Sequence, residues 1–235
     1  MKKIGIIGAM EVEVAGLKER MQQVSQTEHA RMVFYEGTLE GRPVVVVRSG
    51  IGKVNAAVCT QILADRFAVG AVINTGVAGS LDARIDIGDF VLSTDVMHHD
   101  VDAVLFGYAP GEVPQLGQVS FEADRTLADA AEAACRKAMP EHSVWRGRVV
   151  SGDQFIVSRE KKNQISETFG GMCTEMEGAA IAQAAWLNGL PFLIVRAISD
   201  KADDSAVMDY PTFEENAARS SVGMLCEMLR SMPEL

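Results

Sequence analysis

Three carboxylic acids lie near the ends of two apolar, strand-like segments in the last third of the chain. Glu175 and Glu177 flank Met176 where one strand runs into a helix, and the next strand ends at Ser199 and Asp200. In an open α/β sheet, ligands bind at the carboxyl ends of strands, so two neighbouring strand ends that each carry a carboxylate indicate one site. The alternative is structural, with Glu177 as a helix N-terminal acid and Asp200 as an N-cap.

Turns of small residues follow several other strand-like runs, at 8–13, 49–53 and 75–79. None has the G-x-G-x-x-G spacing of a dinucleotide loop or the spacing of a P-loop, so neither ligand type is supported. Glu13, at the end of the first turn, is either a catalytic acid or an ordinary acid of the first helical turn. Several such turns at one sheet edge indicate that backbone N–H groups approach a ligand there.

Phe155 and Ile156 follow another strand-like run, over 143–151. An aromatic ring beside an aliphatic side chain at a strand exit can stack on a planar base. A core phenylalanine beside an ordinary turn explains the same pattern equally well. Both readings therefore stay open at this point.

The bulk properties exclude several function classes. The formal net charge is −10, which disfavours a nucleic-acid partner. The four cysteines form no C-x-x-C pair, and the adjacent His98 and His99 point to opposite faces of a strand, so we expect no metal site. No apolar run approaches the roughly 18 residues of a membrane helix, and the run at 4–10 is too short for a signal peptide. We expect a cytoplasmic protein with reduced thiols and no membrane partner.

Strand-like and helix-like runs alternate along the whole chain, which predicts a mainly parallel sheet covered by helices. No repeat, linker or low-complexity tract interrupts them, so we expect one domain over 1–235. The expected strands cover 4–8, 32–39, 43–49, 69–74, 90–98, 143–151 and 192–198. The expected helices cover 13–21, 53–67, 127–138 and 159–169, with a closing helix that starts near Pro211.

The segment 99–121 resists assignment to a helix or strand. It displays Val104, Leu105, Phe106 and Tyr108 among glycines and prolines, which is too apolar for a loop that lies free in water. We expect a homodimer in which this loop covers the other subunit's site, since a two-fold pair presents the same patch twice. The alternative is that the loop folds back on its own chain.

Seven motifs in this order resemble the 5′-methylthioadenosine/S-adenosylhomocysteine nucleosidases of the purine nucleoside phosphorylase/uridine phosphorylase superfamily. They are K-I-G-I-I-G-A-M-E-V-E (3–13), S-G-I-G-K-V-N-A-A (49–57), I-N-T-G-V-A-G (73–79), H-D-V-D-A-V-L-F-G-Y (99–108), S-G-D-Q-F-I (151–156), E-M-E (175–177) and V-R-A-I-S-D (195–200). The resemblance spans nearly the whole chain. It implies an α/β fold, with a mixed, partly barrel-like central sheet flanked by helices.

The resemblance also implies a reaction. Water would hydrolyse the N-glycosidic bond of a 5′-thioadenosine, either methylthioadenosine or S-adenosylhomocysteine, and release adenine without a cofactor. Asp200, assisted by Ser199, would protonate adenine, and Glu13 would hold and activate the water. The remaining roles are in substrate binding: Glu177 on the ribose hydroxyls, Met176 against the sugar, Phe155 and Ile156 at adenine, Phe106 reaching across from the partner subunit, and further contacts from Met10, Ile51, Ala78, Gly79 and Glu175.

Three departures from the family pattern are visible. The first loop reads E-V-E where members often read E-E-E, Val77 replaces a frequent Ser, and Gly-Ala-Ala follows Glu177 where many members have Ala-Thr-Ala. None removes a proposed catalytic acid.

Three alternatives to this function stay open: a nucleoside phosphorylase of the same superfamily, an aminofutalosine-preferring nucleosidase, and a non-catalytic nucleoside-binding module. Against the phosphorylase, Asn74 and Glu13 stand where phosphate-binding cations are typical, and an acid repels phosphate.

Overall fold

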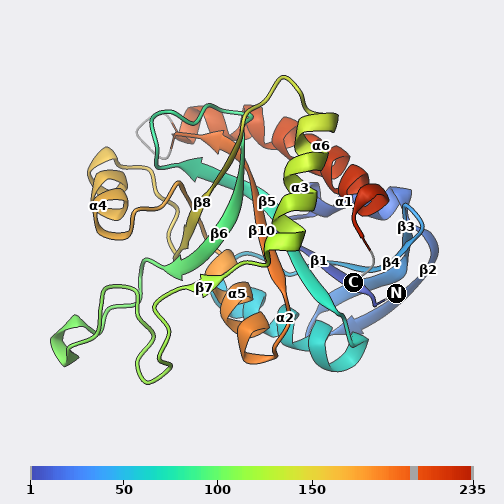
Figure 1. Ribbon diagram of the computed structural model, residues 1–235, viewed down its shortest axis with the longest axis horizontal. Helices are drawn as coiled ribbons and strands as arrows, with labels where there is room; N and C mark the ends of the chain where they lie inside the picture. The colour runs from blue at the N-terminus through green and yellow to red at the C-terminus, as the bar shows by residue number, and fades with distance from the viewer. Residues whose placement is uncertain (1, 202–205, 234–235) are drawn as a thin grey trace.

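The computed structural model describes residues 2–201 and 206–233, with the backbone alone for 206–214 (Figure 1). Its strands form one ten-stranded sheet in the order β10-β6-β8-β9-β5-β1-β4-β3-β2, with β7 paired to β6. The strands are β1 Ile4–Gly8, β2 Gln22–His29, β3 Met32–Leu39, β4 Arg42–Arg48, β5 Ala71–Ser80, β6 Phe90–His98, β7 Phe121–Glu122, β8 Val144–Ser151, β9 Cys173–Glu175 and β10 Phe192–Asp200. The helices are α1 Glu11–Arg20, α2 Lys53–Phe67, the 3₁₀ turn η1 Val104–Phe106, α3 Arg125–Ala138, α4 Arg159–Phe169, α5 Gly178–Leu187 and α6 Ala206–Ser231.

Five of the strands close into a barrel-like ring. β10 pairs in parallel with β5 and antiparallel with β6, and β8 and β9 complete the circuit between β6 and β5. The mixed, partly barrel-like sheet implied by the family resemblance is therefore confirmed. The expectation of a mainly parallel sheet was wrong, because five of the ten pairings are antiparallel. Alternation of strands and helices does not reveal the antiparallel pairs made where the ring closes or in the β2–β3–β4 meander.

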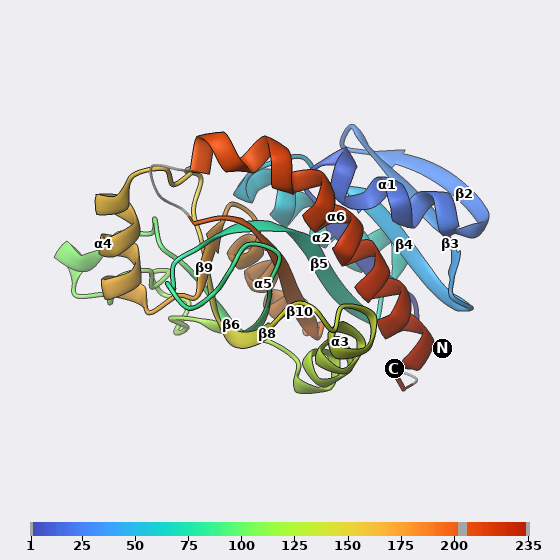
Figure 2. The same cartoon turned by 90° about the horizontal axis from the view of Figure 1, so that it is seen from above.

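Helices cover both faces of the sheet. In Figure 1, α1, α3 and α6 lie above the sheet, and α2 and α5 lie below it. One apolar cluster joins the sheet to α1, α3 and α6, and a second joins it to α2 and α5. Every residue of β1 and β10 is buried, which explains why both read as continuous apolar runs. Figure 2 shows α6 crossing the sheet diagonally, with α4 set apart at the far end.

Two elements differ from the sequence expectation. The β2 strand was missed because it is an exposed edge strand of mostly polar residues, whose extended shape comes from pairing with β3. The closing helix α6 begins at Ala206 rather than near Pro211, because proline is favoured in a first turn and so misplaced the start. The 99–121 segment contains only η1 and the short β7, in line with its irregular sequence.

Among the described residues, no helix is both long enough and apolar enough to cross a membrane. All four cysteines are free thiols and all are buried.

Candidate active site

The predicted site residues other than Phe106 meet in one cleft at the mouth of the barrel. β8 and β9 run antiparallel to β5 and β10. The cleft therefore forms where the ends of oppositely directed strands meet, rather than along one open edge of a parallel sheet. Thr174 of β9 pairs with Gly79 of β5. This pairing places Glu175 and Glu177 beside the end of β5. The cleft is lined by Ala9, Met10, Glu13, Ile51, Val77, Ala78, Gly79, Gln154, Phe155, Ile156, Thr174, Glu175, Met176, Glu177, Ser199 and Asp200.

Glu13 projects from the first turn of α1 into this cleft and is 3% exposed. Its Oε2 accepts the N–H groups of Ala9 and Met10 at 2.7 and 2.9 Å, and its Oε1 accepts the Val77 N–H at 3.1 Å. Burial raises the pKa of Glu13, opposed by the charge of Arg196 and by these three N–H groups. The Glu13 side chain therefore caps α1 and also faces the cleft, so this geometry does not choose between the two sequence readings.

The Glu13 carboxylate fits only because residue 76 is glycine. A Cβ built on Gly76 would lie 2.6 Å from Glu13 Oε1 and 3.0 Å from Arg196 Nη1. Any side chain at this position would push the carboxylate and the guanidinium out of place.

Glu177 stands at the start of α5, where its Oε1 accepts the Gly52 N–H at 2.7 Å. This bond reaches from the start of α5 to the turn before α2, and so ties two walls of the cleft together. Burial raises the pKa of Glu177 to about 7, with a further contribution from the negative charge of Glu175 and opposition from Arg196.

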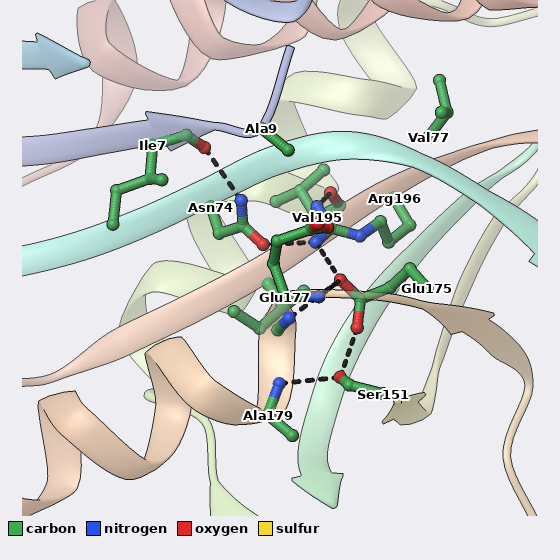
Figure 3. A network of polar contacts seen from close by, with 12 residues as sticks. Ile7, Ala9, Asn74, Val77, Ser151, Glu175, Glu177, Ala179, Val195 and Arg196 are labelled. Carbon is green, nitrogen blue, oxygen red and sulfur yellow. Dashed lines mark hydrogen bonds and ion pairs between the residues drawn. The ribbon is translucent and has the colours of Figure 1, made fainter. Parts of the chain in front are cut away.

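A fully buried guanidinium lies behind these acids (Figure 3). Arg196 pairs with Glu175 and with the Asn74 side-chain oxygen, while Asn74 Nδ2 donates to the Ile7 carbonyl at 2.9 Å. Glu175 also accepts from the Ser151 hydroxyl. The network thus links β1, β5, β8, β9 and β10 beneath the floor of the cleft.

The remaining acid, Asp200, ends β10 and is 2% exposed. Its Oδ2 accepts the Ser199 hydroxyl at 3.0 Å. Since Asp200 lies within β10, its position comes from strand pairing, where Asp200 pairs with Gly79 after a register shift. It is not the N-cap of α6, which begins at Ala206.

Apolar side chains form the rest of the cleft wall. Phe155 is 51% exposed and Ile51 is 52% exposed, although both line the cleft. Half-exposed apolar groups at a cleft mouth are available to a planar or aliphatic ligand. Ile156 is buried beside them and packs with Ile165 of α4.

Phe106 is the predicted site residue that lies outside the cleft of its own chain. It belongs to η1 and is 84% exposed. In Figure 1 this turn projects well beyond the sheet. Within its own chain, Phe106 does not line the cleft.

Sequence reasoning missed the buried network beneath the acids, which consists of Arg196, Asn74 and Ser151. One signal for it was present, because an arginine in the middle of an otherwise apolar strand must find an acidic partner when buried. Metal binding finds no support in the described part of the chain, where no group of three or more His, Cys, Asp or Glu residues is placed to hold an ion.

Comparison with known proteins places this geometry in a family. The model of the phosphorylase superfamily matches residues 3–230. The 5′-methylthioadenosine/S-adenosylhomocysteine nucleosidase of Staphylococcus aureus (strain JH9) is 44% identical over 219 residues, which is 93% of this chain and 95% of the relative.

Two solved structures of similar proteins share the fold. The nucleosidase of the same name from Neisseria meningitidis, in complex with methylthio-immucillin-A, has a TM-score of 0.95 and 43% identity, and the match covers 99% of this chain and 100% of that one. The one from Colwellia psychrerythraea 34H, in complex with adenine, has a TM-score of 0.93 and 41% identity, with 97% and 94% covered. This chain belongs to the 5′-methylthioadenosine/S-adenosylhomocysteine nucleosidase family of the phosphorylase superfamily.

Proposed function

We propose that this protein hydrolyses the N-glycosidic bond of 5′-methylthioadenosine and S-adenosylhomocysteine, and releases adenine and the 5-thioribose product. The observation that carries the proposal is that two buried acids, Glu13 and Asp200, line one cleft with an exposed aromatic ring, Phe155. The family membership of the chain supports the same reaction.

The chemistry of the bond requires acids of this kind. Adenine leaves more readily when a general acid protonates it, and we assign this step to Asp200, oriented by its hydrogen bond with Ser199. The sugar becomes positively charged in the transition state, and a carboxylate nearby stabilises it. An acid and a base that act on opposite sides of one glycosidic bond follow the logic of inverting glycosidases.

The remaining groups bind the substrate and the water. Glu13 holds the attacking water, since its carboxylate is fixed by three backbone N–H groups and faces the cleft. Glu177 accepts the ribose hydroxyls and Met176 packs on the sugar. Phe155 stacks on adenine, whose edge meets the Ile156 backbone. The proposal needs no metal or cofactor.

Water rather than phosphate is the nucleophile in this proposal. Among the residues that the structure describes, those that line the cleft include four carboxylic acids and no lysine or arginine. The Arg196 guanidinium behind the cleft donates hydrogen bonds to Glu175 and Asn74. An acidic cleft of this kind repels a phosphate dianion.

Product analysis with and without phosphate tests the reaction. We expect adenine and free 5-methylthioribose from methylthioadenosine at equal rates in both buffers. Obligatory phosphate, with a ribose 1-phosphate product, would establish the phosphorylase instead. Ligand binding without any adenine release would establish the non-catalytic module. Steady-state rates on methylthioadenosine, S-adenosylhomocysteine, 5′-deoxyadenosine and aminofutalosine test the aminofutalosine alternative, which no observation on this chain favours.

We also propose a cytoplasmic homodimer that serves methionine salvage. Four buried free thiols suit a reducing compartment. Support for the dimer comes from apolar side chains on the surface: Leu105 is 98% exposed and Phe106 84%, and Val54 of α2 and Leu187 of α5 are also exposed. Figure 1 places α2, α5 and the projecting η1 turn along the lower side of the molecule. Such a surface is too apolar for a monomer in water.

A further inference from the structure

The carboxylate of Glu175 lies at the edge of the cleft, yet protein groups occupy it on all sides (Figure 3). Its Oε2 accepts the N–H groups of Glu177 and Gly178, at 3.0 and 2.8 Å, together with the Arg196 guanidinium. Its Oε1 accepts the Ser151 hydroxyl. Oε2 accepts three of these donors and Oε1 accepts one, so protein groups already supply as many donors as a carboxylate usually accepts.

These contacts also fix the start of α5. Glu175 caps the N–H groups of Glu177 and Gly178, and the Ser151 hydroxyl accepts the Ala179 N–H at 2.7 Å. The first N–H groups of a helix have no partner within the helix, so this pair of side chains completes the end of α5. The direction of the Glu177 side chain therefore depends on Glu175.

The negative charge of Glu175 also affects the electrostatics of the site. Three acids, Glu13, Glu175 and Glu177, interact electrostatically with the buried cation Arg196. Burial would raise the pKa of Glu175, but the charge of Arg196 and the hydrogen bonds from Ser151, Arg196 and Glu177 outweigh it and lower that pKa. Glu175 is thus the acid that neutralises Arg196.

We propose that Glu175 is a positioning residue, which does not touch the substrate but orients Glu177 and neutralises Arg196, so that Glu13 and Glu177 remain directed at the cleft. This inference rests on the proposed function for the roles of Glu13 and Glu177. It differs from a direct substrate contact, because it makes the effect of Glu175 electrostatic and transmitted through other side chains.

The electrostatic effect of Glu175 can be measured through the pKa of Glu177. Removing the charge of Glu175 removes a repulsion that raises the pKa of Glu177, while the lowering effect of Arg196 remains. The pKa of Glu177 then falls. The groups that act on Glu177 or share its cleft are Glu175, Arg196, Glu13, Asp200 and the Gly52 N–H.

The substitution Glu175→Gln isolates this charge. The glutamine oxygen can take the place of Oε2 and accept the same three donors. Its amide can take the place of Oε1 and donate to the Ser151 oxygen, which reverses one hydrogen bond without losing it. Only the negative charge disappears.

A stability cycle tests the proposal without relying on catalysis. Thermal unfolding is followed from about pH 5 to about pH 8 for the wild type, Glu177→Gln, Glu175→Gln and the double variant. A raised pKa in the folded state means that stability is present below the ordinary pKa and is lost as pH rises through the folded value, about 7 for Glu177. We expect the Tm of the wild type to fall over this range relative to Glu177→Gln. In the Glu175→Gln background we expect a smaller fall that ends at least about one pH unit lower, because the folded pKa of Glu177 lies closer to its ordinary value. A fall at an unchanged pH overturns the proposal.

Steady-state kinetics provide a second test of the proposal. With methylthioadenosine, Glu175→Gln should lower kcat about tenfold and change KM less than about twofold, since no substrate contact is lost. A loss confined to KM would show a direct contact and reject the proposal. Asp95→Asn is the matched control, because Asp95 pairs with Arg148 at 2.6 Å away from the cleft. It should lower Tm and leave kcat and the pH profile unchanged.

A charge-balanced variant covers the case in which Glu175→Gln does not fold. Glu175→Gln/Arg196→Met removes both members of the buried pair, which proteins often tolerate. We expect it to fold, with the Glu177 transition back near about pH 7. If it also fails to fold, or keeps the shifted transition, Glu175 does not act by neutralising Arg196. If the wild type releases no adenine, the proposed function fails, and the stability cycle still decides this inference.

Discussion

Lys53 and Asp100 form an ion pair, with 2.6 Å between Nζ and Oδ1, that joins the start of α2 to the segment after β6. Asp100 Oδ2 also accepts the Asp153 N–H at 2.9 Å, and Asp153 Oδ1 accepts the Lys53 N–H at 2.8 Å. The three residues, which we call the rim clasp, therefore connect three loops. Two of these loops carry Ile51 and Phe155, which both line the cleft.

Weakening the rim clasp should affect substrate binding more than chemistry. Asp100→Asn keeps an oxygen for the Asp153 N–H but loses the charge that holds Lys53. A partly exposed pair of this kind contributes about 1 kcal/mol, so we expect KM for methylthioadenosine to rise about fivefold with kcat within about twofold. A double-mutant cycle with Lys53→Met measures the coupling. Asp82→Asn, which breaks the Arg84 pair on another loop, is the control. If the effects of Asp100→Asn and Lys53→Met on KM are additive, the two side chains are not coupled and the rim clasp does not support substrate binding.

Glu13→Gln should lower kcat by at least about 100-fold, the usual scale for a general base. Folding should be kept, since glutamine fills the same volume and its oxygen can still accept backbone N–H groups. The neighbouring acid provides a strict control: Glu11 is in the same helical turn but pairs with Lys18 on the surface. Glu11→Gln should therefore leave kcat unchanged. Activity of Glu13→Gln within threefold of wild type, in a folded protein, would assign the water to another group.

Asp200→Asn should also lower kcat by at least about 100-fold, because asparagine has no acidic proton to give to adenine. The loss should be much smaller for a riboside whose leaving group is 4-nitrophenolate, since that anion leaves without protonation. Asp89→Asn is the control, as Asp89 is a buried acid that accepts from Trp145 at 3.0 Å and does not line the cleft. It should cost about 1–3 kcal/mol of stability and leave kcat unchanged. Equal losses on both substrates would argue against an acid role.

The pH dependence of kcat/KM should reveal Glu177. Burial, followed by the charge of Glu175, raises the pKa of Glu177 to about 7, and the ionised form accepts ribose hydroxyls better than the protonated form. Activity per enzyme should thus rise as pH increases through about 7. The measurement is kcat/KM for methylthioadenosine from about pH 5.5 to about pH 8.5. A flat profile would mean that this acid has no role in the free enzyme.

The sequence identified the cleft residues better than the network behind them, for a physical reason. Glu13 comes shortly after β1 and Asp200 is the last residue of β10. Because ligand sites lie at strand ends, local pattern and family motifs were enough to identify both acids. The pairing of Arg196 with Glu175 and Asn74 depends on three strands meeting in the closed ring, which no local pattern encodes. The β2 strand was missed for a related reason, as its extended form comes from its partner β3 rather than from its own residues.

The last prediction concerns assembly. We expect light scattering at micromolar concentration to give twice the monomer mass, because the 99–117 segment exposes Leu105 and Phe106 almost fully. Within its own chain, Phe106 lies outside the cleft, so its proposed contact with the 5′ substituent must be made across a two-fold axis. Phe106→Ala should therefore raise KM for 5′-alkylthio substrates several-fold with little change in kcat, since it removes an apolar contact distant from the reacting bond. Val24→Ala on the exposed edge strand β2 is the control and should change neither quantity. A fully active monomer would refute the dimer, whereas a dimer whose KM is unchanged in Phe106→Ala would keep the assembly and reject the shared pocket.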